Sequence, residues 1–489
     1  MDTAAVILAS ESKASTRTKA FWVLWALELW ERFGYYGVQA ILALYFVSHL
    51  GYTESESFYI FGSFSAFVYG FVWIGGWLGD NYLGAKRTLL LGAIILTSSY
   101  LALAVLGKGT IFYALAGIIV GNTLFKANPS SLISKLYHDH EQGLDGAMTL
   151  YYMAVNVGSM LSMTITPIIA AQGGWLYAFG LCALGLVIGL ACFLMYREHL
   201  SGVSTPAGRQ AMDWQRLAIV LFGSVLSIIV IAQFLMYTWL CTCIIYGFAL
   251  LSFAYYFKLT AQAAPHERTR MLIAFILILQ AVIFFVLYNQ MPTSLTFFAV
   301  HNVNNHFMQL NIPAAEYQVL NAVVIVVMSP ILAKCYTRWP ATHITKFCIG
   351  MSLCAIAFLA LAISKYFAHN GLVSPVWMLV TYFFQSTGEL LISGLGLAMV
   401  AALCPRRMTG FVMGLWFLAT MLAGPLGAWV GAMTTPHVSA GTIITAQQSL
   451  EIYSQVFAEI GLLTGAVALA MWLFRPALNR RLNDCLEGA

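Results

Sequence analysis

Residues 176–195, LYAFGLCALGLVIGLACFLM, decide the fold class, because this stretch contains no charged residue. A helix needs roughly 20 apolar residues to cross the hydrocarbon core of a bilayer. The whole chain has the same character: 60% of its 489 residues are hydrophobic and 9% are charged. Soluble proteins have roughly 45–50% apolar and about 25% charged residues. This composition excludes a secreted enzyme, a nucleic-acid-binding protein and a disordered chain, and it supplies material for about 14 spans.

Further apolar runs extend along the chain on both sides of this stretch. With it, they lie at 21–48, 58–79, 88–107, 110–130, 146–170, 176–195, 217–236, 240–257, 271–298, 316–333, 346–364, 375–402, 409–432 and 453–474. The hydrophilic stretch 197–216 and the polar turn 265–268 divide the runs into six, two and six. The sequence therefore predicts an all-α polytopic membrane protein of 14 spans, in two six-helix bundles with two extra helices between them.

The predicted domains follow these divisions. They are a cytoplasmic N-terminal tail (1–20), an N-terminal bundle (21–195), a linker with two extra transmembrane helices (196–270), a C-terminal bundle (271–475) and a cytoplasmic C-terminal tail (476–489). The orientation follows from the basic residues, which are enriched in cytoplasmic loops. If the N-terminus is inside, 20 of the 24 Lys and Arg residues fall in cytoplasmic segments. Only Lys108 and Lys365 fall outside, so both termini are expected in the cytoplasm.

Five ionisable residues lie deep inside the apolar runs and carry the functional argument: Glu28, Glu31, Arg32, Lys126 and Glu389. A charge at mid-membrane costs about 2.5–3.5 kcal/mol, so five would cost very roughly 12–17 kcal/mol if they faced lipid. Glu28, Glu31, Arg32 and Tyr35 share one helical face through their i, i+3, i+4 and i+7 spacing. We expect the five charges to line a shared polar cavity and to neutralise one another in part; structural ion pairs are the alternative.

Polar residues in other spans support such a cavity. They are Tyr69, Asn122, Tyr152, Asn156, Tyr288, Asn289, Gln290, Gln318, Asn321, Gln385 and Ser393. A single Asn or Ser in a span is more often a contact between helices, but these residues occur in both halves of the chain. Cations in one half and Glu389 in the other suit a zwitterion with separated carboxylate and ammonium groups. The pattern indicates a zwitterionic, peptide-like ligand bound between the halves.

The energy source is expected to be an ion gradient, because the chain has no GxxxxGK[ST] phosphate loop. Two carboxylates beside an arginine suit proton coupling, since a substrate carboxylate that competes for Arg32 would free a Glu to take a proton. The nine cysteines form no CxxC pattern and predict neither a metal site nor a redox site. We expect no cofactor, no enzymatic activity and no nucleic-acid partner.

Two motifs resemble known transporter families. The six-plus-six layout is that of major facilitator transporters, and GGWLGDNYLGAKR at 75–87 resembles the signature that follows their second span. Its Asp80, Lys86 and Arg87 are expected to latch the cytoplasmic ends of neighbouring helices. ELWERFGYY at 28–36 resembles the ExxERFxYY signature of proton-dependent oligopeptide transporters. GNTLFKANP (121–129), DGAMTLYYMAVNVGS (145–159), QMPTSLTFFA (290–299), the segment 318–321, GELLISGLG (388–396) and GLWFL (414–418) resemble further segments of that family's bacterial dipeptide and tripeptide permeases.

The resemblance implies a role for each matching residue. Glu28, Glu31 and Arg32 would couple proton binding to transport, and Arg32 and Lys126 would face the peptide carboxylate. The amino terminus and backbone of the peptide would be held by Asn156, Asn321 and Glu389, with Ser393 beside them. Tyr35, Tyr36, Tyr69 and Trp416 would line side-chain pockets, and Gln290 completes the predicted substrate-binding set.

The chain departs from the family pattern at three places. Residues 288–290 read Tyr-Asn-Gln where many relatives carry an acidic residue. No His lies in the middle of a span, so proton handling would fall to carboxylates. Ala322 follows Asn321 where proline is common.

The resemblance thus implies a proton-coupled symporter that imports dipeptides and tripeptides across a bacterial inner membrane by alternating access and works as a monomer. The alternatives are a major facilitator transporter of another small anion or zwitterion (nitrate, a drug or a modified amino acid) and a non-transporting peptide sensor.

Overall fold

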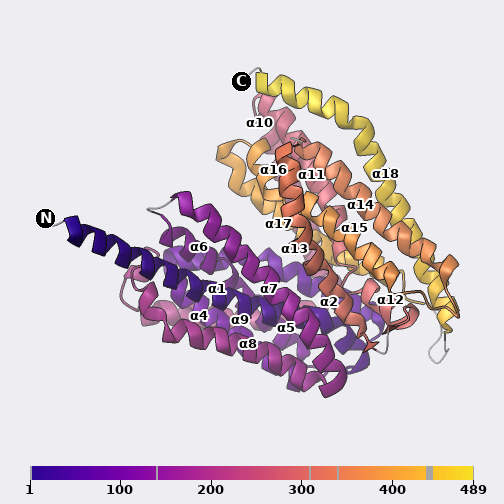
Figure 1. Cartoon of the computed structure of the whole chain (residues 1–489), viewed down its shortest axis with the longest axis horizontal. Helices are drawn as coiled ribbons and strands as arrows, with labels where there is room; N and C mark the ends of the chain where they lie inside the picture. Colours follow the sequence, from indigo (N-terminus) through magenta and orange to yellow (C-terminus); the bar gives the residue numbers. More distant parts are fainter. Residues whose placement is uncertain (1–2, 139–140, 308–309, 339–340, 437–443, 488–489) are drawn as a thin grey trace. The chain divides into compact units, whose positions relative to one another are not determined.

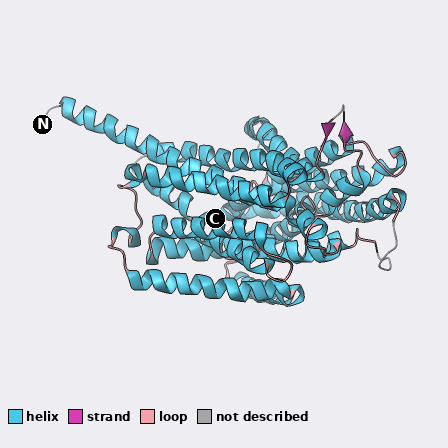
Figure 2. Cartoon of the chain, turned by 90° about the horizontal axis from the view of Figure 1, so that it is seen from below, coloured by secondary structure: helices cyan, strands magenta, loops and turns pink. Residues whose placement is uncertain are grey.

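The computed structural model describes all residues except 1–2, 139–140, 308–309, 339–340, 437–443 and 488–489. Figure 2 shows that the described chain is almost entirely helical, as the sequence predicts, apart from one short pair of strands. The strands β1 (His306–Phe307) and β2 (Leu310–Asn311) are antiparallel, and His306 pairs with Asn311.

The elements, labelled where there is room in Figure 1, are as follows. The first half contains α1 (Thr3–Ser48), α2 (Glu54–Gly70), α3 (Val72–Trp77), the π-helix η1 (Leu78–Tyr82), α4 (Ala85–Val105), α5 (Ile111–Lys126), α6 (Asn128–Leu136), α7 (Glu141–Gly173) and α8 (Trp175–Met195). The middle contains the 3-10 helices η2 (Arg197–Leu200) and η3 (Ala207–Arg209), then α9 (Trp214–Met236) and α10 (Thr238–Gln262). The second half contains α11 (Pro265–Tyr288), α12 (Ser294–Asn302), η4 (Ala314–Gln318), α13 (Val319–Arg338), α14 (His343–Ser364), η5 (Lys365–Phe367), α15 (Val376–Ile392), α16 (Gly396–Leu403), η6 (Arg406–Met408), α17 (Thr409–Ala432) and α18 (Ala446–Glu487).

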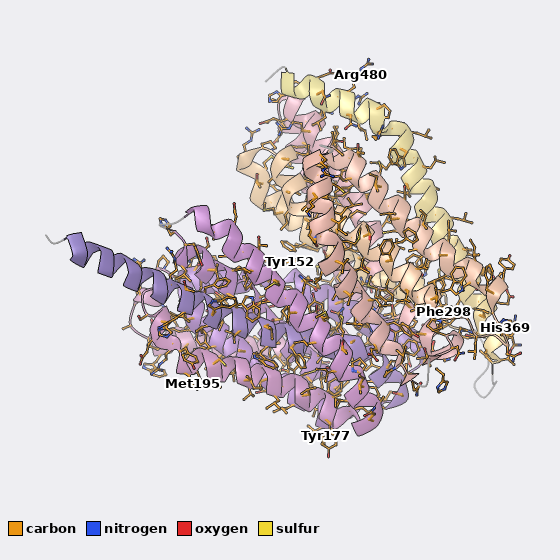
Figure 3. All side chains as sticks on the ribbon, in the orientation of Figure 1. Tyr152, Tyr177, Met195, Phe298, His369 and Arg480 are labelled. Carbon is orange, nitrogen blue, oxygen red and sulfur yellow. The ribbon has the colours of Figure 1, made fainter. Side chains whose placement is uncertain are left out.

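Within the described residues, 13 helical segments are long and apolar enough to cross a membrane. They correspond to the predicted runs from the second to the last, and some join two consecutive helices, such as Ile111–Leu136. The first predicted run, 21–48, lies within α1 and contains Glu28, Glu31 and Arg32, which lower its apolar character. Side chains at the ends of α8 face outward: Tyr177 and Met195, labelled in Figure 3, are each 66% exposed. Such exposed apolar residues suit a surface that faces lipid.

The chain forms two compact units. Unit 1 comprises residues 1–41 and 67–236, and unit 2 comprises residues 42–66 and 237–489. In unit 1, α4 packs on α5 and α8, and α9 packs on α5. In unit 2, α14 packs on α15 and α18, and α11 packs on α17. The extra helices α9 and α10 fall in different units, and residues 42–66 belong to the same unit as the second half.

Close helix contacts in unit 2 depend on glycine. A Cβ atom at Gly62 on α2 would clash with the carbonyl of Gly424 on α17, and a Cβ at Gly424 would clash with Gly62 in turn. The long span at 376–403 is interrupted after Ile392, and α16 resumes at Gly396. A Cβ at Gly396 would overlap the ring of Trp416 on α17. Because Gly396 has no side chain, the ring of Trp416 can pack against the backbone at this position.

Candidate functional site

The first polar cluster lies inside unit 1 and centres on Arg32 of α1. Glu28, Glu31 and Arg32 are all buried. Arg32 donates from Nε to Oε2 of Glu31 at 2.5 Å and from Nη2 to Oε1 at 2.7 Å, which makes a two-pronged ion pair. Its Nε also lies 3.6 Å from Oε1 of Glu28. Such fork-to-fork pairing is the strongest geometry for an arginine and a carboxylate. Three residues that share a helical face in the sequence therefore form one buried charge cluster.

Residues from other helices of unit 1 complete the cluster. Asn122 of α5 accepts from Nη2 of Arg32 at 3.1 Å and donates to the carbonyl of Val68 at 3.0 Å. Lys126, one turn later on α5, interacts electrostatically with Glu28, Glu31 and Arg32. Since Lys126 carries a second positive charge beside Arg32, the two carboxylates face two cations. The five predicted intramembrane charges are thus distributed as four in unit 1 and one, Glu389, in unit 2.

Aromatic side chains cover one side of Arg32. Its guanidinium lies 4.9 Å from the ring centre of Tyr35 and 5.9 Å from that of Tyr36. Tyr35 is buried and forms a hydrogen bond with Tyr69 of α2. A cation over an aromatic face is stabilised by the ring quadrupole, more strongly where water is excluded. Tyr35, Tyr36 and Tyr69 therefore belong to the Arg32 cluster.

The sequence analysis expected Tyr152 and Asn156 of α7 to support a polar cavity, but the structure gives the two residues different surroundings. The amide of Asn156 donates to the carbonyl of Tyr152 in its own helix at 2.9 Å. Tyr152, labelled in Figure 3, is 55% exposed. Its neighbour Tyr151, which the sequence analysis did not single out, interacts with Glu28 through its hydroxyl. Adjacent residues on a helix face directions about 100° apart, so only one of a Tyr-Tyr pair can face the cluster.

The second polar cluster lies inside unit 2 and centres on Glu389 of α15. Asn321 of α13 donates to Oε2 of Glu389 at 2.7 Å and to the hydroxyl of Ser386 at 2.9 Å. The backbone carbonyl of Glu389 accepts from the amides of Ser393 and Gly394, which places Ser393 directly at the break between α15 and α16. Asn321, Glu389 and Ser386 therefore form one hydrogen-bonded group, and Ser393 lies one helical turn after Glu389.

Gln290 and Trp416 are buried and held by their neighbours. Gln290 donates to the carbonyls of Val286 and Gly427 and accepts from Ser294. Trp416 packs against the rings of Phe285 and Phe347. Gln290 thus contacts α11, α12 and α17, and Trp416 of α17 contacts α11 and α14, all within unit 2.

The predicted structural residues Asp80, Lys86 and Arg87 bind two different partners. Asp80 pairs with Lys135 of α6 at 2.6 Å and accepts a hydrogen bond from Ser131, so it contacts the end of a neighbouring helix. Lys86 and Arg87 instead donate to linker carbonyls, those of Leu200 and Gln210, each at 2.9 Å. Thr205 strengthens this attachment by donating to the carbonyl of Gly79. The basic pair therefore fastens the linker to the turn after η1.

The comparisons with known proteins agree with the sequence motifs. Residues 86–449 match the family model described as PTR2, the POT family. The chain is 46% identical to dipeptide and tripeptide permease A of Edwardsiella piscicida, over 96% of each protein. It is 43% identical to dipeptide and tripeptide permease B of Photorhabdus asymbiotica, over 95% of this chain and 96% of that protein.

Solved structures show the same relationship. The crystal structure of tetrameric PepTSo2 superposes with a TM-score of 0.86 at 34% identity, over 95% of this chain and 99% of that one. A structure solved to explain substrate recognition in proton-dependent oligopeptide transporters gives a TM-score of 0.82 at 36% identity, over 95% of this chain and all of that one. This likeness confirms the predicted fold class. The chain is a multi-pass membrane protein and belongs to the POT family, a family of transporters.

Proposed function

We propose that the protein is a proton-coupled symporter that imports dipeptides and tripeptides by alternating access. Two relatives that match it end to end are named dipeptide and tripeptide permeases. The observation that carries the proposal is the buried group of Glu28, Glu31 and Arg32 on α1. Charges kept in a membrane span at such cost serve a function by default.

The Arg32–Glu31 pair gives the coupling its chemistry. Arg32 donates two hydrogen bonds to Glu31, from Nε and Nη2. A peptide carboxylate can accept hydrogen bonds from the same two nitrogens. A peptide that takes Arg32 leaves Glu31 as a buried carboxylate without its partner, and protonation removes that penalty. Binding of the peptide and uptake of a proton therefore favour each other, and Lys126 adds a second positive charge for the carboxylate.

Glu389 and Asn321 of unit 2 offer a group that suits the ammonium end of the peptide. A carboxylate held by an amide is a suitable partner for a peptide ammonium group. Asn156, Ser393 and Gln290 contribute amide and hydroxyl groups for the peptide backbone, while Tyr36, Tyr69 and Trp416 contribute apolar surface for its side chains. Because separate groups serve the ammonium group, the backbone and the side chains of the peptide, such a site favours short zwitterionic ligands.

The proton gradient supplies the energy, and no cofactor takes part. A potential of about 150 mV contributes roughly 3.5 kcal/mol per proton, which sustains several-hundred-fold accumulation of a neutral zwitterion. The protein works as a monomer in the bacterial inner membrane, with both termini in the cytoplasm.

The test is uptake of labelled dialanine by proteoliposomes with an imposed inward pH gradient. We expect accumulation above that of empty liposomes and its loss when a protonophore collapses the gradient. Folded protein that gave no uptake would refute the proposal. Unlabelled dipeptides should compete, whereas nitrate and free amino acids should not; the opposite pattern would assign the protein to another anion or zwitterion. Peptide binding without counterflow would identify a sensor.

A further inference from the structure

Tyr100 of α4 has a buried hydroxyl that lacks a structural explanation. Its side chain is 0% exposed, and among the residues that the structure describes the hydroxyl has no hydrogen-bond partner. Buried polar groups in folded proteins are nearly always paired, so an unpaired one points to a missing partner or to a second state in which it is paired.

The position of Tyr100 identifies that partner. A Cβ at Gly34 of α1 would lie 2.7 Å from Cε2 of Tyr100, the ring atom next to the carbon that bears the hydroxyl. Gly34 follows Glu31 by three residues and shares its helical face. The hydroxyl interacts electrostatically with Glu31, Arg32 and Cys182. The phenol therefore lies beside the Arg32–Glu31 pair, on the side supplied by α4.

While Glu31 is paired with Arg32, its carboxylate oxygens already accept hydrogen bonds and do not require one from Tyr100. Each of its oxygens accepts one donor from Arg32. The other groups around it are Glu28 of α1, Lys126 of α5 and Tyr151 of α7. When Arg32 turns to a ligand carboxylate, both oxygens lose their donors, and Tyr100 offers an unused O–H donor from α4.

We propose that Tyr100 is a positioning residue for proton coupling, whose hydroxyl donates a hydrogen bond to Glu31 when Arg32 binds a peptide carboxylate. The inference rests on the proposed function. Tyr100 keeps its own proton throughout, while the transported proton joins and leaves the Glu31 carboxylate. By donating to the deprotonated carboxylate, the hydroxyl stabilises Glu31 after its proton has left.

The test is Tyr100→Phe in the proteoliposome assay across a range of pH. Without the donor, the deprotonated carboxylate is less stable. We expect the pH profile of uptake to move about one pH unit upward and the maximal rate to fall about tenfold, the effect of one lost hydrogen bond to a charged group. The KM for dialanine should change little, because Tyr100 does not touch the peptide. The thermal midpoint of the purified protein should not fall, since the hydroxyl is unpaired in the resting structure.

Tyr382 of α15 provides a matched control. Its side chain is also 0% exposed, and its hydroxyl also has no hydrogen-bond partner among the described residues. Among the residues that the structure describes, no charged group interacts with this hydroxyl. Tyr382→Phe should leave the pH profile unchanged. An unchanged profile in Tyr100→Phe, or an equal shift in Tyr382→Phe, would overturn the inference.

A second measurement separates this inference from the proposed function. If the wild-type protein itself took up no peptide, the proposed function would fail. Infrared titration of the Glu31 carboxylate band, assigned by its loss in Glu31→Gln, then tests Tyr100 alone in an Arg32→Gln background, where Glu31 has lost its partner. Adding Tyr100→Phe should shift that band and its titration midpoint. Identical bands with and without the hydroxyl would overturn the inference.

Discussion

At the scale of single residues, Arg32 is held by contacts from several sides. It is almost completely buried, and it binds Glu31 through a fork, Asn122 through Nη2 and Tyr35 through its face. Removing one member of a buried ion pair costs about 3–5 kcal/mol, because the other charge is left without compensation. Under the proposed function, a ligand that replaces Glu31 at Arg32 therefore has to bring an anionic group, and a peptide carboxylate meets this need.

Glu31→Gln should uncouple transport from the proton gradient. Glutamine is close in shape to glutamate but cannot carry the proton, so gradient-driven uptake should be lost while some exchange of labelled for unlabelled peptide remains. Glu451→Gln is the matched control, because Glu451 is an exposed carboxylate paired with Lys365. Full concentrative uptake by Glu31→Gln would remove Glu31 from the coupling role.

Cys404, between α16 and η6, should be chemically inert. Burial raises the pKa of its thiol to about 11, although nearby Arg270 opposes the rise. The reactive thiolate is therefore scarce at pH 7.5, and the thiol is also inaccessible. In a mass-spectrometric time course with a maleimide, exposed Cys335 should label first and Cys404 only after unfolding. Equal labelling rates in folded protein would contradict this burial.

The sequence predicted the charge cluster of α1 well but its surroundings poorly. Helical spacing places Glu28, Glu31 and Arg32 together whatever the other helices do. The choice between Tyr151 and Tyr152 depends on the rotation of α7, which the sequence does not determine. Tyr100 was missed because a lone tyrosine in an apolar run is not distinguishable from a packing residue.

At the scale of elements, glycines rather than charges decide how closely helices approach. Gly62→Ala should destabilise the protein by about 1–3 kcal/mol, because the added methyl group meets the backbone of α17 at Gly424. The thermal midpoint in detergent should fall by several degrees. Gly410→Ala is the control: it lies in α17 with open space around it, so the substitution should be neutral or slightly stabilising. Equal midpoints for the two variants would contradict the packing of α2 on α17.

The sequence did not predict where the helix within a membrane span is interrupted. The run 375–402 has no proline after Pro375 at its start, yet its helix is interrupted between Ile392 and Gly396. Gly394 and Gly396 permit such an interruption, but Gly92, Gly117 and Gly185 leave α4, α5 and α8 intact. The binding of Lys86 and Arg87 to the linker was likewise unpredicted, because the linker has no periodicity from which its path can be derived.

At the scale of the whole molecule, the basic residues predict the orientation in the membrane. A green fluorescent protein fused after residue 489 should fluoresce, because it folds in the cytoplasm, and alkaline phosphatase at the same point should be inactive. The same reporters fused within 301–316, which contains no Lys or Arg, should behave in the opposite way. Active phosphatase at the C-terminus would reverse the proposed topology.

The division of the chain into units has a consequence for recombination. Residues 42–66 come early in the sequence yet belong to unit 2. This segment, called the arm below, is the part of the first half that packs with the second half. A hybrid joined at 236/237 from two homologous proteins would carry a foreign arm in its second unit. Such a hybrid inherits Gly62 from one parent and its partner Gly424 from the other, so compatible parents must match at this pair. If the arm were exchanged together with the second half, Gly62 and Gly424 would come from the same parent. Such a hybrid needs two further crossovers, near residues 42 and 66, in addition to the one at 236/237.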